Sequence, residues 1–102
     1  AYSLSAGGPI VDPAVDCLLL TPVCPHSLYA RSYIFSAAAR LTLRPEESRG
    51  EAAYLTVDGE ESVRIYLGDA VQISRSAYPA SLIRLKEQPF YQTLHQKLTS
   101  RR

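Results

Sequence analysis

Apolar and polar residues alternate along much of this chain in the two-residue period of a strand with one buried face. In the segment 53–57, for example, Leu55 and Val57 face inward while Tyr54 and Thr56 face outward. Short segments with this alternation or with β-forming residues recur about every ten residues, separated by turn signals. Strands are therefore predicted at residues 17–20, 33–35, 39–44, 53–57, 63–67, 71–73 and 81–85.

The prolines and glycines set the limits of these strands. The continuously apolar run 17–20 lies between Pro13 and Pro22, which favours a strand buried on both faces over a helix. Asp58-Gly59 is a hairpin turn signal, because both residue types tolerate positive φ. Gly68-Asp69 marks a second turn. The strands are thus expected to be joined by short antiparallel connections.

Both ends of the chain carry helical patterns instead. Tyr2 and Ala6 stand four residues apart, and Gly7-Gly8-Pro9 would stop a short helix. Near the other end, Phe90, Tyr91, Leu94 and Leu98 form a helical stripe behind Pro89, a residue that a first helical turn accepts. The predicted fold is mainly all-β: an antiparallel β-sandwich with a short N-terminal helix and one C-terminal helix.

Composition limits the classes of partner. The chain has 102 residues, a net charge of +1 and 46% hydrophobic residues, which suits one ordered domain. The balanced charge gives no reason to expect nucleic acid, and no apolar stretch approaches the ~20 residues of a membrane span. Cys17 and Cys24 have neither metal-ligand spacing nor a disulfide framework, so we expect two ordinary thiols in a reducing, cytoplasmic setting, with Cys17 buried.

The residues alone show little catalytic chemistry. His26 follows Cys24-Pro25, where a loop histidine can bind or catalyse, but no third group is visible to orient a thiolate pair. His95 is expected to be a surface or packing residue on the final helix. Asp58 is either a structural turn residue or a binding residue. Tyr2 is either a core residue or a ring that stacks on a base, and this pattern does not choose between them.

The string AYSLSAGGPIVDPAVDCLLLTPVCPHSL, residues 1–28, resembles the C-terminal signature region of NAD kinases. These enzymes phosphorylate NAD to NADP with ATP or polyphosphate. From the Ala-Tyr pair onward, the family's pattern is Ser-x-Ser-Ala-Gly-Gly-Pro, then a strand, then a turn of the type Thr-Pro-x-x-Pro-His. The later Val57-Asp58-Gly59, the turn at 67–69 and the final helix from Phe90 are also similar to the family's order of elements, so the resemblance covers the whole chain.

The resemblance implies a set of NAD-binding residues. Ala1 and Tyr2 match the Ala-Tyr that lines the adenine pocket, and Ser5 matches a polar residue of that pocket. Cys24 and His26 match the turn that reaches a nucleotide on a neighbouring subunit. Asp58 and Gly59 match positions near the nicotinamide, although the family often has a larger residue in place of Gly59. The family's catalytic Gly-Gly-Asp-Gly segment, whose Asp acts as the base toward the ribose 2′-hydroxyl, is absent from these residues. The resemblance therefore implies no catalytic residue and no metal ligand in this chain.

These expectations describe residues 1–102 as the C-terminal β-sandwich portion of an NAD kinase of ~250–300 residues, without its N-terminal α/β catalytic domain. Mg²⁺ would act with ATP in the whole enzyme, and homo-oligomerisation, as a dimer or tetramer, would run through the sandwich. The chain by itself is expected to be inactive. The alternative is a non-enzymatic β-sandwich that self-associates. A relative of the diacylglycerol-type kinases is disfavoured by the residues 1–9.

Overall fold

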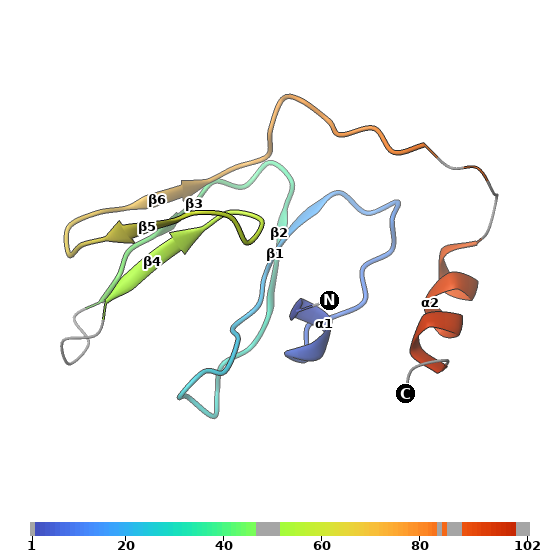
Figure 1. Ribbon diagram of the computed structural model, residues 1–102, viewed down its shortest axis with the longest axis horizontal. Helices are drawn as coiled ribbons and strands as arrows, with labels where there is room; N and C mark the ends of the chain where they lie inside the picture. Colours follow the sequence, from blue (N-terminus) through green and yellow to red (C-terminus); the bar gives the residue numbers. More distant parts are fainter. Residues whose placement is uncertain (1, 47–51, 84, 86–88, 100–102) are drawn as a thin grey trace. The chain divides into compact units, whose positions relative to one another are not determined.

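The computed structural model describes residues 2–46, 52–83, 85 and 89–99 (Figure 1). The described part is mainly antiparallel β-structure with a helix near each end, as the sequence predicts. The elements in chain order are α1 (Tyr2–Ser5), β1 (Cys17–Leu20), β2 (Tyr33–Ser36), β3 (Leu41–Leu43), β4 (Ala53–Thr56), β5 (Ser62–Ile65), β6 (Val71–Ile73) and α2 (Phe90–Thr99).

The chain divides into two compact units. The terminal unit comprises Ala1–Ala37 and Ser76–Arg102, and the central unit comprises Ala38–Arg75. The terminal unit contains α1, the β1–β2 pair and α2, while the central unit contains the pairs β3–β6 and β4–β5. Each unit is therefore built around its own two-stranded sheets.

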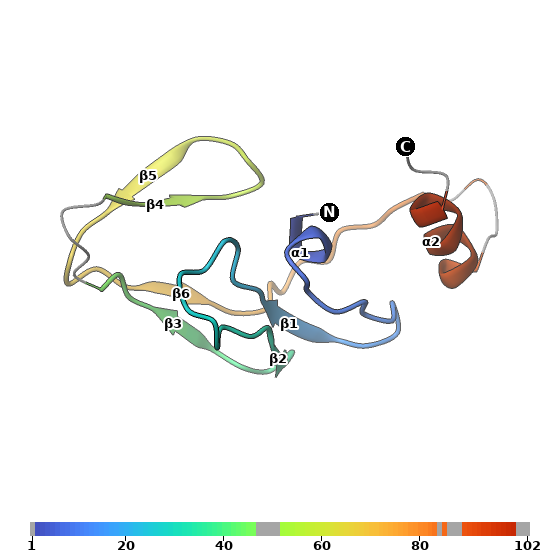
Figure 2. The ribbon, with the colours of Figure 1, turned by 90° about the horizontal axis from the view of Figure 1, so that it is seen from below.

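In the terminal unit, β1 and β2 pair antiparallel, with Leu18 opposite Phe35 and Leu20 opposite Tyr33 (Figure 2). All four residues of β1 are half-buried. The expectation that β1 is buried on both faces, with Cys17 inside, is therefore wrong for the described structure. Burial of both faces requires a layer on each side of a sheet, and the two-stranded β1–β2 sheet does not have both of its faces sealed from water.

In the central unit, each strand pair has one apolar face. Leu55 lies opposite Val63 across β4–β5, and Leu41 lies opposite Ile73 across β3–β6. The outer face of β4–β5 carries Arg64, whose guanidinium carbon lies 4.9 Å from the centre of the Tyr66 ring and 5.7 Å from that of Tyr54. A cation over aromatic faces adds a modest attraction to the cross-strand pairing.

The predicted strands are longer than the observed ones in the central unit. Val57 and Leu67, expected to face inward, lie outside the strands and are 64% and 61% exposed. The reason is turn geometry. The backbone amide of Glu60 donates to the Val57 carbonyl at 3.0 Å, which ends β4 at Thr56 and places Val57 in the turn. Similarly, the amide of Asp69 donates to the carbonyl of Tyr66 at 3.0 Å, which places Leu67 in a turn.

The strand expected at 81–85 is wrong. Residues 81–83 and 85 have irregular backbone and exposed side chains, and residue 84 lies outside the described residues. Leu82 and Ile83 are 87% and 91% exposed. Apolar residues favour a strand only where a neighbouring strand supplies hydrogen-bond partners, and no described strand pairs with this segment.

Among the described residues, no hydrophobic side chain is fully buried. The apolar faces of the strand pairs are half-buried or exposed, so neither unit has a closed core of its own. The strands form three separate two-stranded sheets. The face-to-face packing of two sheets that defines a sandwich stays a prediction.

Helix α2 is tied to the rest of the terminal unit by a hydrogen bond. The Tyr91 hydroxyl donates to Oδ2 of Asp12 at 3.0 Å, and Oδ1 of Asp12 accepts from the backbone amide of Ala14 at 2.8 Å. The hydrogen bond to the Asp12 carboxylate is the main cause that raises the pKa of Tyr91 above its ordinary value of 10.0, and the charge of Asp12 acts in the same direction. Asp12 therefore holds a turn and the tail helix with one carboxylate.

Replacing Tyr91 with phenylalanine is expected to detach α2 from this turn. A raised pKa means that folding favours the protonated phenol. The bond's contribution to stability is thus complete below the ordinary tyrosine pKa and disappears as the pH rises through the raised value. In amide NMR spectra at neutral pH, Tyr91→Phe should shift Asp12 and Ala14. At alkaline pH, deprotonation of Tyr91 should shift the carboxyl carbon signal of Asp12 in the wild type and not in Tyr91→Phe.

Tyr78→Phe serves as the control, because Tyr78 belongs to the same unit and is 88% exposed. It should leave the amides of Asp12 and Ala14 in place. Equal shifts in the two variants would show that Tyr91 does not hold this contact.

Candidate functional site

The signature segment folds into α1 and a tight helix end. The amide of Gly7 donates to the Leu4 carbonyl at 3.1 Å, and the amide of Gly8 donates to the Ser3 carbonyl at 2.7 Å. Gly7 has a φ of 88°. This pair of bonds around a left-handed residue is the Schellman motif, which satisfies the last carbonyls of a helix. The expected stop at Gly7-Gly8 is confirmed.

On this short helix, the predicted nucleotide residues face solvent. Tyr2 is 87% exposed, and Ser5 is exposed as well. Ala1 lies outside the described residues. The alternative that Tyr2 is a core residue does not hold in the described structure, since its ring is not covered. A ring presented in this way has its faces free for stacking.

Three hydroxyl groups join α1 to the strands beside it. Oγ of Ser3 lies 3.1 Å from Oγ1 of Thr21, and the Ser32 hydroxyl donates to the same Thr21 oxygen at 3.2 Å. Thr21 follows β1 and Ser32 precedes β2. These hydrogen-bonded hydroxyls therefore hold α1 against both ends of the β1–β2 connection. Gly8, which follows α1, is the only described residue that is buried.

The β1–β2 connection carries the other two predicted residues of this unit. Cys24 and His26 are both exposed, and Cys24 has a φ of 51°. The left-handed backbone at Cys24 turns the chain between Pro22 and Pro25. Cys24 carries a free thiol.

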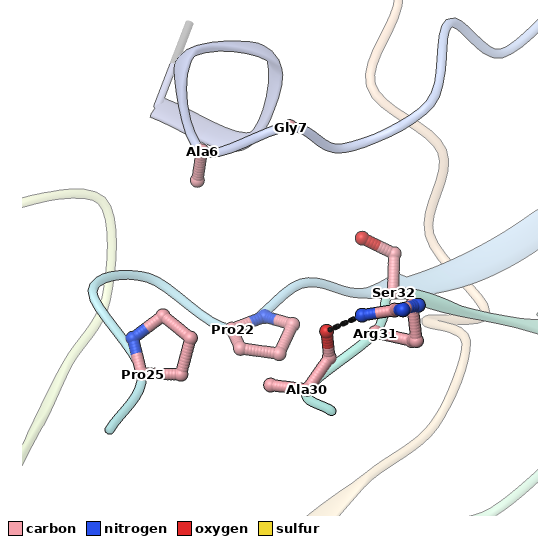
Figure 3. A pocket seen from close by; sticks show the side chains of 7 residues that line it. All are labelled: Ala6, Gly7, Pro22, Pro25, Ala30, Arg31 and Ser32. Carbon is pink, nitrogen blue, oxygen red and sulfur yellow. Dashed lines mark hydrogen bonds between the residues drawn. The ribbon is translucent and has the colours of Figure 1, made fainter. Parts of the chain in front are cut away.

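A cavity of about 230 Å³ lies between the end of α1 and the β1–β2 connection (Figure 3). Two loop prolines and the side chains of Ala6 and Ala30 form the apolar part of its lining. Arg31 provides the charge in its lining. The predicted residues Ser5, Cys24 and His26 are sequence neighbours of the lining residues and do not line it themselves. The lining residues are Ala6, Gly7, Pro22, Pro25, Ala30, Arg31 and Ser32.

Asp58 and Gly59 belong to the central unit, in the turn between β4 and β5. Their φ angles are 52° and 71°, as in a type I′ turn. The backbone conformation therefore agrees with the alternative that Asp58 is a structural turn residue. Both residues are exposed. The structure thus brings Tyr2, Ser5, Cys24 and His26 into one unit and describes Asp58 and Gly59 in the other.

Sequence reasoning missed the residues that shape this cavity. Ser3 and Thr21 carry no catalytic pattern, and their pairing depends on the fold. Arg31 did have a sequence signal, because it is the only lysine or arginine among residues 1–39.

Metal and membrane features are absent from the described ranges. In residues 2–46, 52–83, 85 and 89–99, no three His, Cys, Asp or Glu residues gather so that they could hold a metal ion. No helix within the same ranges is long and apolar enough to cross a membrane.

These observations define the class of the molecule: a mainly antiparallel β protein with an exposed aromatic residue on α1 and a small cavity, lined by one charged residue, next to the end of that helix. The family model of the ATP-NAD kinase C-terminal domain matches residues 1–85. The chain belongs to this family. The match includes every predicted site residue and ends before α2.

Curated relatives agree with the family match. The chain is similar to the NAD kinase of Symbiobacterium thermophilum, with 48% identity over 97% of this chain and 35% of the relative. It is also similar to the NAD kinase of Citrifermentans bemidjiense, with 37% identity over 95% of this chain and 34% of the relative. For the NAD kinase of Moorella thermoacetica, the identity is 40% over 96% of this chain and 31% of the relative. The chain thus spans about a third of the length of these relatives.

Proposed function

We propose that this chain is the C-terminal portion of an NAD kinase. The whole enzyme transfers a phosphoryl group from ATP, or from polyphosphate, to the 2′-hydroxyl of the adenosine ribose of NAD and so makes NADP. The observation that carries this proposal is the family match over residues 1–85, together with relatives named NAD kinase. An N-terminal α/β domain would supply the base that accepts the hydroxyl proton.

The part played by this chain is to bind nucleotide and to contact other subunits. Exposed Tyr2 offers a stacking face for adenine, and Ser5 on the same helix offers a hydroxyl. Cys24 and His26 form the exposed loop that reaches a nucleotide on a neighbouring subunit. Asp58 and Gly59 contribute on the nicotinamide side, and Ala1 belongs to the adenine pocket.

Phosphoryl transfer depends mainly on positioning and on neutralising charge at the phosphates. Mg²⁺ bound to ATP supplies that neutralisation in the whole enzyme. We assign no metal ligand to the described residues, since no suitable cluster occurs among them. We expect this chain by itself to be inactive, because the N-terminal domain would supply the base, and its contribution is to hold the dinucleotide in place.

The test is an NAD titration of the chain, followed by amide NMR. Saturable shifts are expected at Tyr2, Ser5 and His26. Tyr2→Ala should weaken NAD binding about tenfold, because stacking on an aromatic ring contributes about 1–3 kcal/mol per base. Tyr78→Ala, which removes another highly exposed ring of the same unit, should leave the affinity unchanged.

A non-enzymatic, self-associating module is the second candidate. The observation that favours it is the exposure of the apolar sheet faces, since no hydrophobic side chain is fully buried in the described part. Unpaired strand edges and open apolar faces promote association with further copies. Sedimentation equilibrium during the same titration separates the candidates. Dimers or tetramers with NAD shifts support the NAD kinase proposal, whereas association without any shift at millimolar NAD contradicts it.

A further inference from the structure

Arg31 occupies an unusual position in the terminal unit. It is the only lysine or arginine among the first 39 residues, and it lines the cavity between α1 and the β1–β2 connection. The other lining side chains are small, apolar or a hydroxyl, so the cavity has one positive charge and no carboxylate. An anion is the ligand that such a lining favours.

The guanidinium of Arg31 is held by the backbone. Its Nη1 donates to the Ala30 carbonyl at 3.0 Å (Figure 3). The same nitrogen donates to the Leu28 carbonyl at 3.4 Å. These bonds orient the planar group without neutralising its charge. They involve a single nitrogen of the group, so the N–H donors on Nε and Nη2 take no part in these two bonds. A fixed fork of N–H donors matches two oxygens of a phosphate.

The remaining polar group of the lining does not compete for this role. Ser32 donates its hydroxyl proton to Thr21, so that proton is engaged within the protein. The cavity of about 230 Å³ is smaller than the roughly 300–1,000 Å³ of pockets that enclose a whole ligand. It has room for one group of a larger molecule, whose remainder would extend over the exposed surface beside it.

We propose that Arg31 and this cavity form a subsite for a phosphate group of a nucleotide, with Arg31 as the side chain that binds it. This inference rests on the proposed function, which supplies a nucleotide for this unit. The two phosphates of a dinucleotide and the phosphates of ATP share the chemistry that Arg31 recognises.

The test uses inorganic pyrophosphate, NAD and ATP as three separate titrants of the chain, followed by the Arg31 side-chain Nε–H signal and by calorimetry. Arg31→Gln should weaken pyrophosphate binding about tenfold or more, as expected for the loss of a charge-assisted bond. Arg31→Lys keeps the charge but not the planar fork of donors. Its affinity for pyrophosphate should lie between those of the wild type and Arg31→Gln. Arg44→Gln removes an exposed arginine of the central unit and should bind as the wild type does.

The outcomes separate this inference from the proposed function. Equal pyrophosphate affinity in the wild type and Arg31→Gln overturns the subsite, and so does an equal loss in Arg44→Gln, which indicates non-specific attraction. If Arg31→Gln disturbs the loop, Arg31→Lys decides: weakened pyrophosphate affinity in a chain with wild-type amide shifts supports the subsite, and wild-type affinity overturns it. If NAD binds and neither NAD nor ATP binding depends on Arg31, the subsite alone is refuted. Pyrophosphate binding through Arg31 with no NAD binding refutes the proposed function alone.

The titrations with NAD and ATP identify which nucleotide supplies the phosphate. If Arg31→Gln weakens NAD binding and leaves ATP binding unchanged, the subsite takes a phosphate of the dinucleotide. The reverse pattern assigns it to the phosphoryl donor. Either pattern supports the subsite.

Discussion

Gly8→Val is expected to destabilise the terminal unit by about 3 kcal/mol, the upper end of the usual cost of forcing extra atoms into a packed site. A Cβ at position 8 would overlap Oγ of Ser3 and would lie 2.7 Å from the Ser3 carbonyl oxygen. The same carbonyl accepts the Gly8 amide at 2.7 Å, so the two backbones cannot move apart without losing that bond. Hydrogen exchange at the Gly8 amide and the thermal midpoint of the unit measure the effect.

Two further variants identify the source of the clash. Gly8→Val combined with Ser3→Ala should recover only part of the loss, because the Ser3 carbonyl remains in place when its hydroxyl is removed. Ser5→Ala, on the exposed side of the same helix, should change stability by less than about 0.5 kcal/mol. Full rescue by the double variant would place the whole clash at the Ser3 hydroxyl. Wild-type stability of Gly8→Val would refute the tight approach of α1.

Gly59→Val is expected to destabilise the β4–β5 hairpin by about 2 kcal/mol. Gly59 has a φ of 71°, a left-handed conformation that costs a residue with a Cβ roughly 1–2 kcal/mol, and β-branching makes that region still less accessible. Space is not the cause, because a Cβ at this position would meet nothing within 4 Å. The measurement is hydrogen exchange at Glu60, whose amide closes the turn on the Val57 carbonyl.

Asp58→Gly is the matched control in the same turn. Asp58 also has a left-handed φ, 52°, so glycine relieves strain there while it loosens the unfolded chain. The two effects oppose each other, and a change of less than about 1 kcal/mol is expected. Equal destabilisation by Gly59→Val and Asp58→Gly would show that side-chain contacts of the turn, rather than its backbone conformation, hold the hairpin.

The local features of this protein follow from its sequence. Gly7 and Gly8 after a helical pattern predict the helix end that α1 has, because few other residues adopt the required backbone. The Asp58-Gly59 pair predicts its turn for the same reason. Alternation predicts four of the observed strands, and the apolar run 17–20 and the β-forming residues 33–35 predict the other two. The helical stripe that follows Pro89 predicts α2. The resemblance carried by residues 1–28 also leads to the family that the comparison establishes.

Where the expected strands were too long or absent, the sequence pattern lacked information about partners. Leu82 and Ile83 have the composition of a strand, yet they lie in an exposed irregular segment, because a strand exists only where another strand supplies its hydrogen bonds. Likewise, the apolar run of β1 suits burial on both faces, but burial depends on the layers that cover a sheet.

The sequence by itself determined the turns, the helix ends and the family, since these depend on residues that are close along the chain. Only the tertiary structure decided which distant groups meet. It joined Ser3 and Ser32 to Thr21, attached Tyr91 to Asp12 across 79 positions, and placed Arg31 in a cavity that residues after α1 also line. Such contacts depend on how the chain folds back on itself, and the spacing of residue types along a sequence carries no record of that.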